Sequence, residues 1–488
     1  MKTFNIICAA DEKFGIGIKN DTKNKGIPWD LPTDMKYFRK ITGYSESVTG
    51  INVVIMGRTT ADLIGKPLPN RYNIRLSRKL ESIKSSEDFS KTNYDKEFIN
   101  CSSLDSAMDL VNNVLTDVEN VFIIGGGELY KEAIYSPILK YVYLTHIKHD
   151  YDCDIFFPNI SDKQMSNNFT VLSRKLVYDN NIMCEFTKLE RKPHEEYQYL
   201  NLLEKIISTG HRRQTRNAIT YSLFGEKMEF DLSSFPLLTT KKVFMRGIFE
   251  ELKFFLMGKT DSKILEEKGV NIWRDNTTRD FLDKVGLEHY KEGDMGSMYF
   301  YNVFHFGNKY EGCDKNYTGM GYNQWAYVMN LLKTDPYSRR NIFTTYNPST
   351  AHEGVLYPCH GLLCQFYVEE GHRLTCSMTM RSNDFICGNP FNVASYSLMV
   401  YIMCELLNND ESYVGPKFVP GKFIIFMNDV HVYEDNLEQA KEQLQRNPFP
   451  FPKLCFKKKF TKIEELQWED IEVVDYKCHD AIKVKMVA

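Results

Sequence analysis

The sequence predicts an α/β domain built on a mostly parallel sheet, followed by a second domain with longer helices. The first observation is length, because 488 residues suffice for two to four domains. The second is that apolar, strand-like runs alternate with helical stretches over roughly residues 1–190, as in a parallel sheet with flanking helices. The third is that the helical stretches lengthen beyond Glu195. We therefore expect two domains of different architecture.

Each element of the first domain follows from an apolar pattern between turn signals. Strands are predicted at residues 4–10, 52–56, 72–77, 121–125, 142–147 and 169–177. Helices are predicted at residues 33–42, 104–114 and 127–133. In the second domain, long helices are predicted at residues 197–209, 243–257 and 392–407.

The boundary between the domains is a change in composition. Residues 188–200 lose the apolar periodicity and become charged, as a linker does. We therefore predict the first domain at residues 1–188, the linker at 189–195 and the second domain at 196–488.

The composition is that of an ordinary globular protein, with 43% hydrophobic residues, 26% charged residues and a formal net charge of −3. No unbroken apolar run of about 18 residues occurs, so we expect no membrane span. The near-neutral charge gives no general attraction to nucleic acid, and we expect none to bind.

The 12 cysteines are scattered, without a CxxC pair or a Cys/His run at zinc spacing. We expect no metal site and no disulfide framework, and we assign the protein to the cytoplasm. Lys2 and the apolar run 4–10 could begin a signal peptide, but Asp11 and Glu12 follow where a cleavage region would lie. We interpret the run as a buried first strand.

Three glycines, Gly125, Gly126 and Gly127, connect a predicted strand to a predicted helix. Glycine lets a ligand approach the backbone closely, and a helix N-terminus attracts an anion, so this turn could cradle a phosphate. A plain tight turn explains the glycines equally well, and the run lacks the GxGxxG spacing of a dinucleotide fold.

Asp34 lies in the first turn of the predicted helix 33–42. An acidic residue there is usually a solvated partner of the helix dipole. Its neighbours Trp29 and Phe38 are aromatic and indicate partial burial instead. Burial would raise the pKa of the Asp34 carboxyl and let it hold or relay a proton.

The first domain resembles dihydrofolate reductase over almost its whole length. The segments that carry the likeness, in order, are AADEKFGIG (9–17), IPWDLPTDM (27–35), VVIMGRTT (53–60), LPNRYNIRLSR (68–78), IIGGGELY (123–130) and YLTHI with DIFFP (143–158). The resemblance implies that Asp34 assists protonation of dihydrofolate N5 through water and that Thr145 hydrogen-bonds Asp34. It also implies that Phe38 packs on the folate and that Arg71 grips its α-carboxylate, which a planar guanidinium suits.

The same resemblance implies NADPH as cofactor. Arg58, Ser77 and Arg78 would bind its 2′-phosphate, which favours NADPH over NADH on grounds of charge. Further cofactor contacts, including the mobile loop 15–17 over the nicotinamide, are implied for Ala9, Gly15, Ile16, Gly17, Thr59, Thr60, Gly125, Gly126, Gly127 and Glu128.

In the second domain, Cys359 directly precedes His360. A single cysteine is most often a buried, unreactive residue. Arg339, Arg340 and Arg381 strengthen a catalytic interpretation, because cations near a thiol lower its pKa and populate the nucleophilic thiolate. The same arginines could hold a substrate phosphate, and a surface charge cluster is the alternative.

Residues from about 195 to 488 resemble thymidylate synthase. The segments that carry the likeness are FPLLTTKKVFMRGIFEEL (235–252), GNPFNVASYSLM (388–399), VPGKFIIF (419–426), DVHVYEDN (429–436) and the closing AIKVKMVA. The resemblance implies an α+β domain that converts dUMP to dTMP with 5,10-methylenetetrahydrofolate. Cys359 would be the nucleophile that adds to C6 of dUMP, with His360 as its catalytic neighbour.

Other roles follow from the same resemblance. Glu251 and Tyr299 would manage protons, and Trp273 and Asp384 would face the folate. The residues implied to bind dUMP are Arg381 and Ser382 at the phosphate, Asn392 at the uracil edge, and His431 and Tyr433 at the deoxyribose hydroxyl.

Arg339 and Arg340 would reach the dUMP phosphate of the neighbouring subunit, which implies a homodimer through the second domain. The order of the two domains on one chain resembles the bifunctional protozoan dihydrofolate reductase–thymidylate synthases.

The likeness to thymidylate synthase has departures. The usual phosphate loop DRTGTGT reads QTRNAIT (214–220), with Thr215 in place of an arginine and Arg213 or Arg216 close enough to substitute. The usual YGFQWRHF reads YFYNVFHF (299–306).

Met380 replaces a usual Gln and Asn383 a usual Cys. Methionine is a poor hydrogen-bond partner, and a missing polar contact often costs about 1–3 kcal/mol. One alternative hypothesis is therefore an active reductase fused to a catalytically weak, dimerising scaffold. Another is a protein that binds nucleotides or nucleic acid without turnover. The intact Cys359 argues against both, because neither needs a thiolate.

Overall fold

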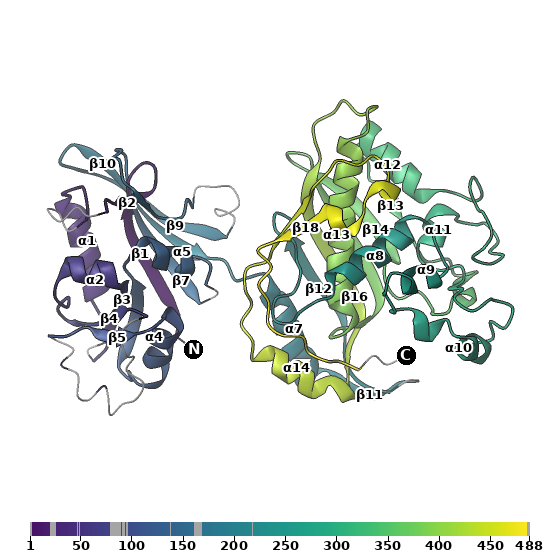
Figure 1. The fold of residues 1–488 in the computed structure, drawn as a ribbon, viewed down its shortest axis with the longest axis horizontal. Coiled ribbons are helices and arrows are strands. Elements are labelled where there is room, and N and C mark those ends of the chain that lie inside the picture. The colour runs from purple at the N-terminus through teal and green to yellow at the C-terminus, as the bar shows by residue number, and fades with distance from the viewer. Residues whose placement is uncertain are drawn as a thin grey trace. The chain divides into compact units, whose positions relative to one another are not determined.

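The structure is a computed structural model that describes residues 2–19, 26–45, 47, 49–78, 89, 93, 96–136, 138–160, 168–216 and 218–485. Two compact units, Met1–Pro193 and His194–Ala488, divide the chain (Figure 1). The last three residues of the quoted segment AIKVKMVA, and Asn217 in QTRNAIT, lie outside the described residues.

The N-terminal unit is a sheet with helices on both faces. Its strands are β1 (Phe4–Ala10), β2 (Gly15–Gly17), β3 (Ile51–Gly57), β4 (Arg71–Leu76), β5 (Ile99–Cys101), β6 (Val118–Ile123), β7 (Leu139–Ile147), β8 (Ile155–Phe156), β9 (Phe169–Asp179) and β10 (Ile182–Arg191). Its helices are α1 (Pro32–Gly43), α2 (Arg58–Ile64), α4 (Leu104–Asn113) and α5 (Gly127–Ala133).

The main sheet has the strand order β5-β4-β3-β6-β1-β7-β10-β9. All pairings from β5 to β7 are parallel, whereas β10 pairs antiparallel with β7 and β9. The predicted α/β fold with a mostly parallel sheet is therefore confirmed.

Alternate side chains of each central strand are buried on opposite faces of this sheet. On β1, Phe4 and Ile6 join the large core that includes α4, whereas Ile7 packs with Val54 and with Phe38 of α1. Burial on both faces explains why the central strands are near-continuous apolar runs.

The C-terminal unit also combines a sheet with helices. Its strands are β11 (His211–Gln214), β12 (Ile219–Asp231), β13 (Ile342–Phe343), β14 (Leu363–Glu369), β15 (Arg373–Asp384), β16 (Val419–Tyr433), β17 (Lys453–Phe456) and β18 (Ile471–Val474). Its helices are α7 (Glu196–Thr209), α8 (Met245–Leu256), α9 (Lys263–Glu266), α10 (Arg279–Lys284), α11 (Phe300–Phe304), α12 (Gln324–Thr334), α13 (Gly388–Asn408) and α14 (Leu437–Leu444).

The main sheet of this unit has the order β11-β12-β16-β15-β14-β13, in which only β15 and β16 pair in parallel. Helix α13 packs on β15, β16 and α8. It begins four residues before the predicted helix 392–407, because Pro390 is tolerated in a first turn.

The length and composition of α13 would suffice for a membrane span, although its sequence contains no unbroken apolar run. However, 67% of its most apolar window is buried in the C-terminal unit, as in the core helix of a globular domain.

The other face of this sheet carries exposed apolar side chains. Leu363 on β14 is the pairing partner of Thr379 on β15, and Thr379 is the pairing partner of Phe426 on β16, so the three side chains lie on the same face. Leu363, Tyr367 and Phe426 are 41%, 67% and 43% exposed. We call these three residues the open sheet face.

Candidate active sites

The first candidate site begins with Asp34, in the first turn of α1. Pro32 starts the helix, and the Thr33 backbone N–H donates to Oδ2 of Asp179 at 2.6 Å. The buried Thr145 side chain on β7 hydrogen-bonds the Asp34 carboxyl. Burial outweighs this bond and raises the pKa of Asp34, and the charge of Asp179 acts in the same direction. The fold thus brings Asp34 and Thr145 together and favours a carboxyl that keeps its proton.

Arg71 lies near the other end of α1. Its Nη1 donates to Oγ1 of Thr42 at 2.6 Å, and its Nε to the Pro69 carbonyl at 3.0 Å. Among the described residues, its Nη2 has no hydrogen-bond acceptor. Asp34 and Thr42 are separated by roughly 12 Å of helix, with Phe38 between them. This spacing suits an elongated ligand with a negative group at one end.

A second set of predicted residues gathers where parallel strands end. The Gly57 N–H at the end of β3 donates to the Gly125 carbonyl after β6 at 2.8 Å. Gly125 has φ of 135°, and a Cβ on Gly125 or Gly126 would lie 3.3 Å from Oγ1 of Thr60. Glycine is therefore favoured at Gly125, and the Thr60 side chain lies close against this backbone, at the turn where a phosphate cradle is predicted.

Basic side chains border the same edge of the sheet. Arg58 follows β3 and Arg78 follows β4, and both are exposed, while Ser77 beside Arg78 is buried. Because the carboxyl ends of parallel strands share one edge, these groups and the glycines face a common region. The donor set fits a dinucleotide that carries an additional phosphate.

Asp11 directly follows β1, and its sequence pattern does not indicate the role that the structure shows for it. It is buried, and its Oδ1 accepts the backbone N–H groups of Gly15 (2.6 Å) and Lys13 (2.9 Å). Its Oδ2 accepts the Tyr151 N–H at 3.3 Å. A Cβ on Gly15 would lie 2.3 Å from Cβ of Cys153, so only glycine fits there. Asp11 therefore holds the loop 13–15 against the segment before β8.

The second candidate site is centred on Cys359. Its Sγ lies 3.2 Å from the hydroxyl of Tyr299, and the Arg381 backbone N–H donates to the Cys359 carbonyl at 2.9 Å. Tyr299 has φ of 48°, which is uncommon for a residue with a side chain and is typical of functional sites. The Nε of Arg381 donates to the Pro358 carbonyl at 3.1 Å.

The predicted lowering of the Cys359 pKa by a nearby cation is present for Arg381, but it does not dominate in the free chain. Burial raises the pKa of the thiol, and the opposing effects of Tyr299 and Arg381 are smaller. Arg339 and Arg340, which are predicted to act in the neighbouring subunit, lie apart from Arg381 in sequence and position on the sheet. Both are exposed and lie just before the edge strand β13.

Three further predicted residues lie around Tyr299. The Trp273 Nε1–H donates to Oε1 of Glu251 at 2.8 Å, and burial raises the pKa of Glu251 to about 7. The Trp273 ring lies 5.9 Å from the Tyr299 ring. The His360 ring stacks on Tyr299 at 4.2 Å, and burial lowers the pKa of His360 to about 3. The site therefore contains a neutral imidazole, His360, and a carboxyl group, Glu251, whose pKa is close to neutral pH.

Of the predicted nucleotide contacts, His431 has the most defined surroundings. Its Nδ1 lies 2.9 Å from Oδ1 of Asp429, whose Oδ2 accepts from Arg213 at 2.6 Å. Arg213 is therefore engaged with Asp429, whereas the charge of Arg216 acts on Tyr433. Thr215, where the resemblance expects an arginine, donates its hydroxyl to the Ala218 carbonyl at 2.6 Å and stabilises a turn.

The remaining predicted contacts are distributed over β15 and α13. Ser382, Asp384 and Asn392 are all half-buried. Burial raises the pKa of Asp384, and its Oδ1 accepts the Cys387 N–H at 3.1 Å.

Two of the departures from the family pattern contact each other. The Asn383 Nδ2 donates to the sulfur of Met380 at 2.8 Å, and both residues are buried. The Met380 thioether therefore accepts an amide N–H from within the protein, whereas its expected weakness as a partner for the nucleotide stays a prediction. The Asn383 Oδ1 has no partner among the described residues.

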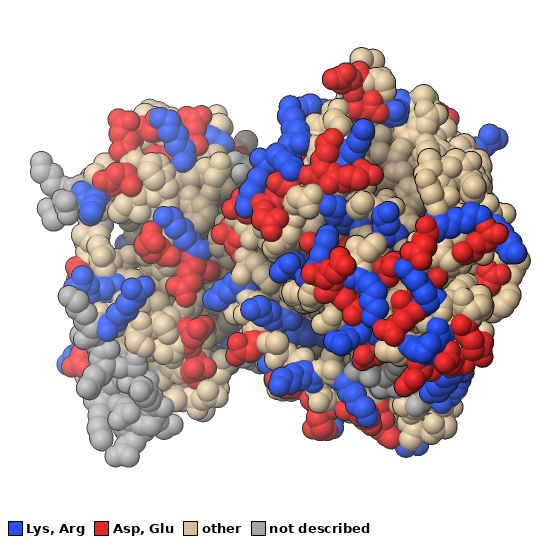
Figure 2. Space-filling view, turned by 45° about the vertical axis from the view of Figure 1, so that its right-hand side comes forward, with Lys and Arg blue, Asp and Glu red and all other residues tan. Residues whose placement is uncertain are grey.

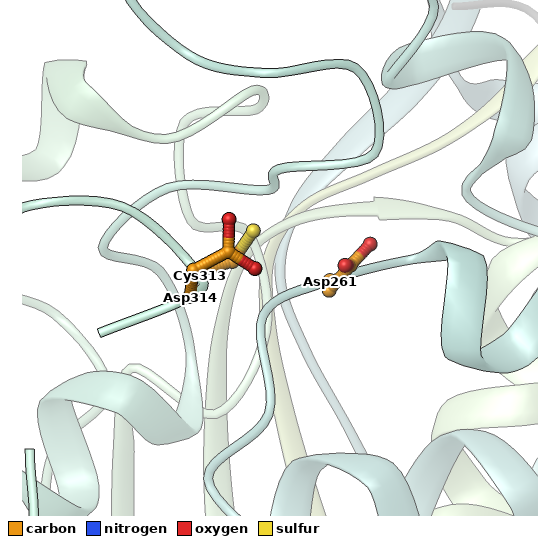
Figure 3. A group of neighbouring side chains, drawn as sticks. All are labelled: Asp261, Cys313 and Asp314. Carbon is orange, nitrogen blue, oxygen red and sulfur yellow. The ribbon is translucent and has the colours of Figure 1, made fainter. Parts of the chain in front are cut away.

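One group of side chains outside both sites has the spacing of metal ligands. Figure 3 shows Asp261, Cys313 and Asp314, whose ligand atoms lie within 4.8 Å of one another. Lys291 Nζ already pairs with Oδ2 of Asp261 (3.1 Å) and Oδ1 of Asp314 (2.7 Å). Both carboxylates therefore already have a cationic partner.

Acidic and basic side chains are interspersed over the face of the C-terminal unit that Figure 2 shows.

Comparison with known proteins identifies the two units. Residues 3–191 match the dihydrofolate reductase family model, and residues 197–488 match the thymidylate synthase family model. The bifunctional dihydrofolate reductase-thymidylate synthase 1 of Arabidopsis thaliana is 36% identical over 522 residues, covering 99% of this chain and 96% of its own length. The bifunctional enzyme of Paramecium tetraurelia is 36% identical, with 99% of each chain covered. That of Leishmania amazonensis is 35% identical, covering 100% of this chain and 95% of its own length. The chain belongs to the bifunctional dihydrofolate reductase–thymidylate synthase family.

Proposed function

We propose that this chain reduces dihydrofolate with NADPH and converts dUMP to dTMP with 5,10-methylenetetrahydrofolate. We assign the reductase to residues 1–188 and the synthase to 196–488, with 189–195 as the tether. The chain divides into its two compact units between Pro193 and His194, within this tether, which supports the assignment. The last residues of β10, up to Arg191, also fall within the tether. The observation that carries the synthase function is the contact of Cys359 with Tyr299, beside Arg381.

In the reductase, Asp34 would hold a proton for N5 of dihydrofolate, and Thr145 would orient its carboxyl. Arg71 would bind the α-carboxylate through Nη2, the guanidinium nitrogen that has no acceptor among the described residues. Gly57, Gly125 and Gly126 would admit the phosphates of NADPH, which supplies the hydride when bound.

In the synthase, the Cys359 thiolate would attack C6 of dUMP. Burial raises the pKa of the thiol in the free chain, so formation of the thiolate would depend on Tyr299 and Arg381, whose opposing effects stabilise the charged form. Glu251, with a pKa near 7, is suited to proton transfer during the later steps.

The function is tested by assaying the purified full-length chain for both activities. NADPH oxidation that depends on dihydrofolate tests the reductase. Formation of dTMP that depends on dUMP and methylenetetrahydrofolate tests the synthase. Reductase activity without dTMP formation would favour the scaffold hypothesis, and absence of both would favour a binding protein.

Cofactor choice gives a first prediction. Replacing Arg58 and Arg78 with Ala should raise the KM for NADPH by roughly 10- to 100-fold and leave that for NADH almost unchanged, because charge-assisted bonds to the 2′-phosphate are lost. Arg75→Ala is the matched control, since Arg75 on β4 pairs with Asp62. An equal loss for both cofactors would show that Arg58 and Arg78 are structural.

We further propose a two-fold homodimer through the open sheet face. Leu363, Tyr367 and Phe426 are large apolar side chains on one face, and such a contiguous exposed surface is typical of an interface. Arg339 and Arg340 precede β13 at the edge of the same sheet, so they are available to the partner's site. A two-fold interface would exchange these arginines reciprocally.

Shared sites predict complementation between inactive chains. Cys359→Ala chains mixed with Arg339→Ala/Arg340→Ala chains should regain synthase activity, because one hybrid site holds both the thiol and the arginines. At full exchange about half of the dimers are hybrids with one working site, so roughly a quarter of wild-type activity should return. Demonstrated subunit exchange without recovery would contradict shared sites, while the reductase assay serves as the internal control.

We also propose a cytoplasmic location. All 12 cysteines are free, including the exposed Cys455, which fits a reducing compartment.

A further inference from the structure

We propose that Tyr396 is a positioning residue of the synthase site, which fixes His360 as the tautomer protonated on Nε2. This inference rests on the proposed synthase function, because it concerns the orientation of a residue next to the nucleophile. Neither the sequence pattern nor the family resemblance selected Tyr396.

Tyr396 lies on α13 and is only 3% exposed. Its hydroxyl is 3.0 Å from Nδ1 of His360, and the two rings meet edge to face at 5.8 Å and 82°. The approach is close, because a Cβ on the neighbouring Gly361 would lie 2.0 Å from the Tyr396 hydroxyl. Gly361 has φ of 62°, so both its conformation and its surroundings require glycine.

The number of available partners determines the direction of this hydrogen bond. A tyrosine hydroxyl carries one proton, and among the described residues the Tyr396 hydroxyl meets no acceptor except Nδ1 of His360. If Nδ1 carried a proton, the buried hydroxyl proton would have no acceptor, at a substantial energetic cost. The hydroxyl therefore donates to Nδ1, and the single proton of the neutral imidazole is on Nε2.

This arrangement links Tyr396 to the nucleophile through two further contacts. The His360 ring stacks on Tyr299 with 16° between the ring planes, and the Tyr299 hydroxyl contacts Sγ of Cys359. Burial keeps the imidazole neutral, so its tautomer alone decides which nitrogen can donate. With Nδ1 occupied by Tyr396, the Nε2–H of His360 is the donor available to a bound nucleotide or to water.

The first test is the Tyr396→Phe variant of the full-length chain, which removes only the hydroxyl. We expect synthase kcat to fall roughly 10-fold, as for the loss of one orienting hydrogen bond, with KM for dUMP changed less than twofold. Tyr401→Phe is the matched control, since Tyr401 is on the same helix but donates to the Leu232 carbonyl. Its synthase kcat should stay near that of the wild type. A kcat for Tyr396→Phe within twofold of wild type would overturn the proposal.

The second test reads the tautomer directly in the resting enzyme. In ¹⁵N-histidine-labelled protein, the His360 signals are those lost in His360→Asn. We expect an unprotonated Nδ1 and a protonated Nε2 in the wild type and in Tyr401→Phe, but a mixture of tautomers in Tyr396→Phe. A protonated Nδ1 in the wild type, or an unchanged spectrum in Tyr396→Phe, would refute the inference.

A double-mutant cycle separates positioning from general damage. If Tyr396 acts through His360, Tyr396→Phe should cost less than about twofold in a His360→Asn background. Multiplicative losses would contradict action through His360. Unchanged reductase activity in every variant reports an intact chain. If the wild type itself makes no dTMP, the proposed synthase function fails, whereas the tautomer measurement still decides the role of Tyr396.

Discussion

Replacing Asp34 with asparagine is expected to lower dihydrofolate turnover by about 10²–10⁴-fold at neutral pH. Asparagine keeps the size of the side chain and can still hydrogen-bond Thr145, but its amide has no ionisable proton to transfer. Binding of NADPH should change little, because the glycines and arginines of the cofactor region lie on other segments. The measurement is kcat for NADPH oxidation together with the Kd for NADPH. Near-normal turnover at pH 7 would show that Asp34 is not the proton-relaying group.

The raised pKa of Asp34 adds a pH dependence and a control. The wild-type rate should fall as pH rises through that raised pKa, and Asp34→Asn should lose this dependence. The folded state binds the Asp34 proton more tightly than the unfolded chain, so ionisation above the unfolded pKa of about 3.9 destabilises the fold. Asp34→Asn removes this effect and should be at least as stable as the wild type at pH 7. Asp30→Asn, at an exposed position before α1, is the matched substitution that should leave turnover unchanged.

Cys359→Ala is expected to reduce dTMP formation by roughly 10⁴–10⁶-fold, because the covalent step has no substitute. Reductase activity should be unaffected, since Asp34 and its partners belong to the other unit. Cys313, which lies with Cys359 in the C-terminal unit and is half-buried, provides the matched control. Burial raises the pKa of its thiol to about 12, so this thiol is not expected to be reactive. Cys313→Ala should therefore retain synthase activity.

A covalent trap makes the same prediction without relying on turnover. With 5-fluoro-dUMP and methylenetetrahydrofolate, the wild type should form an adduct at Cys359 that mass spectrometry detects on the peptide containing that residue. Cys359→Ala should form none. An adduct on another cysteine would reassign the nucleophile, and the absence of any adduct beside normal reductase activity would support the scaffold hypothesis.

Much of the fold could be predicted because it depends on local apolar patterns. The strand 4–10 and the helix 127–133 have the predicted bounds. Strand β10 was missed, and part of it was assigned to the linker, because charged residues such as Glu185 and Lys188 interrupt its apolar alternation. Its pairing between β7 and β9 is a tertiary property that this pattern does not encode.

The candidate sites could be predicted only as far as residue type and family resemblance allow. Burial cannot be read from the segment around Cys359, so the sequence predicts the lowering effect of Arg381 on the thiol pKa but not the larger, opposite effect of burial. Asp11 and Tyr396 lie within segments that resemble the two families, but nothing in the residues around them indicates their roles. Their importance appears only once the chain brings Tyr151 to Asp11 and His360 to Tyr396.

The position of β1 has a consequence for synthesis of the protein on the ribosome. β1 is the first strand to be made, but it lies in the middle of its sheet, between β6 and β7. Its partners, such as Phe122 for Asn5 and Thr145 for Ala9, are translated more than a hundred residues later. Loop-closure entropy opposes pairing between strands so far apart in sequence. The apolar segment FNIICAA therefore stays unpaired on its β7 side until β7 has left the ribosome. The nascent reductase is therefore exposed to aggregation until then, and chaperones that shield its first strand during translation would protect it.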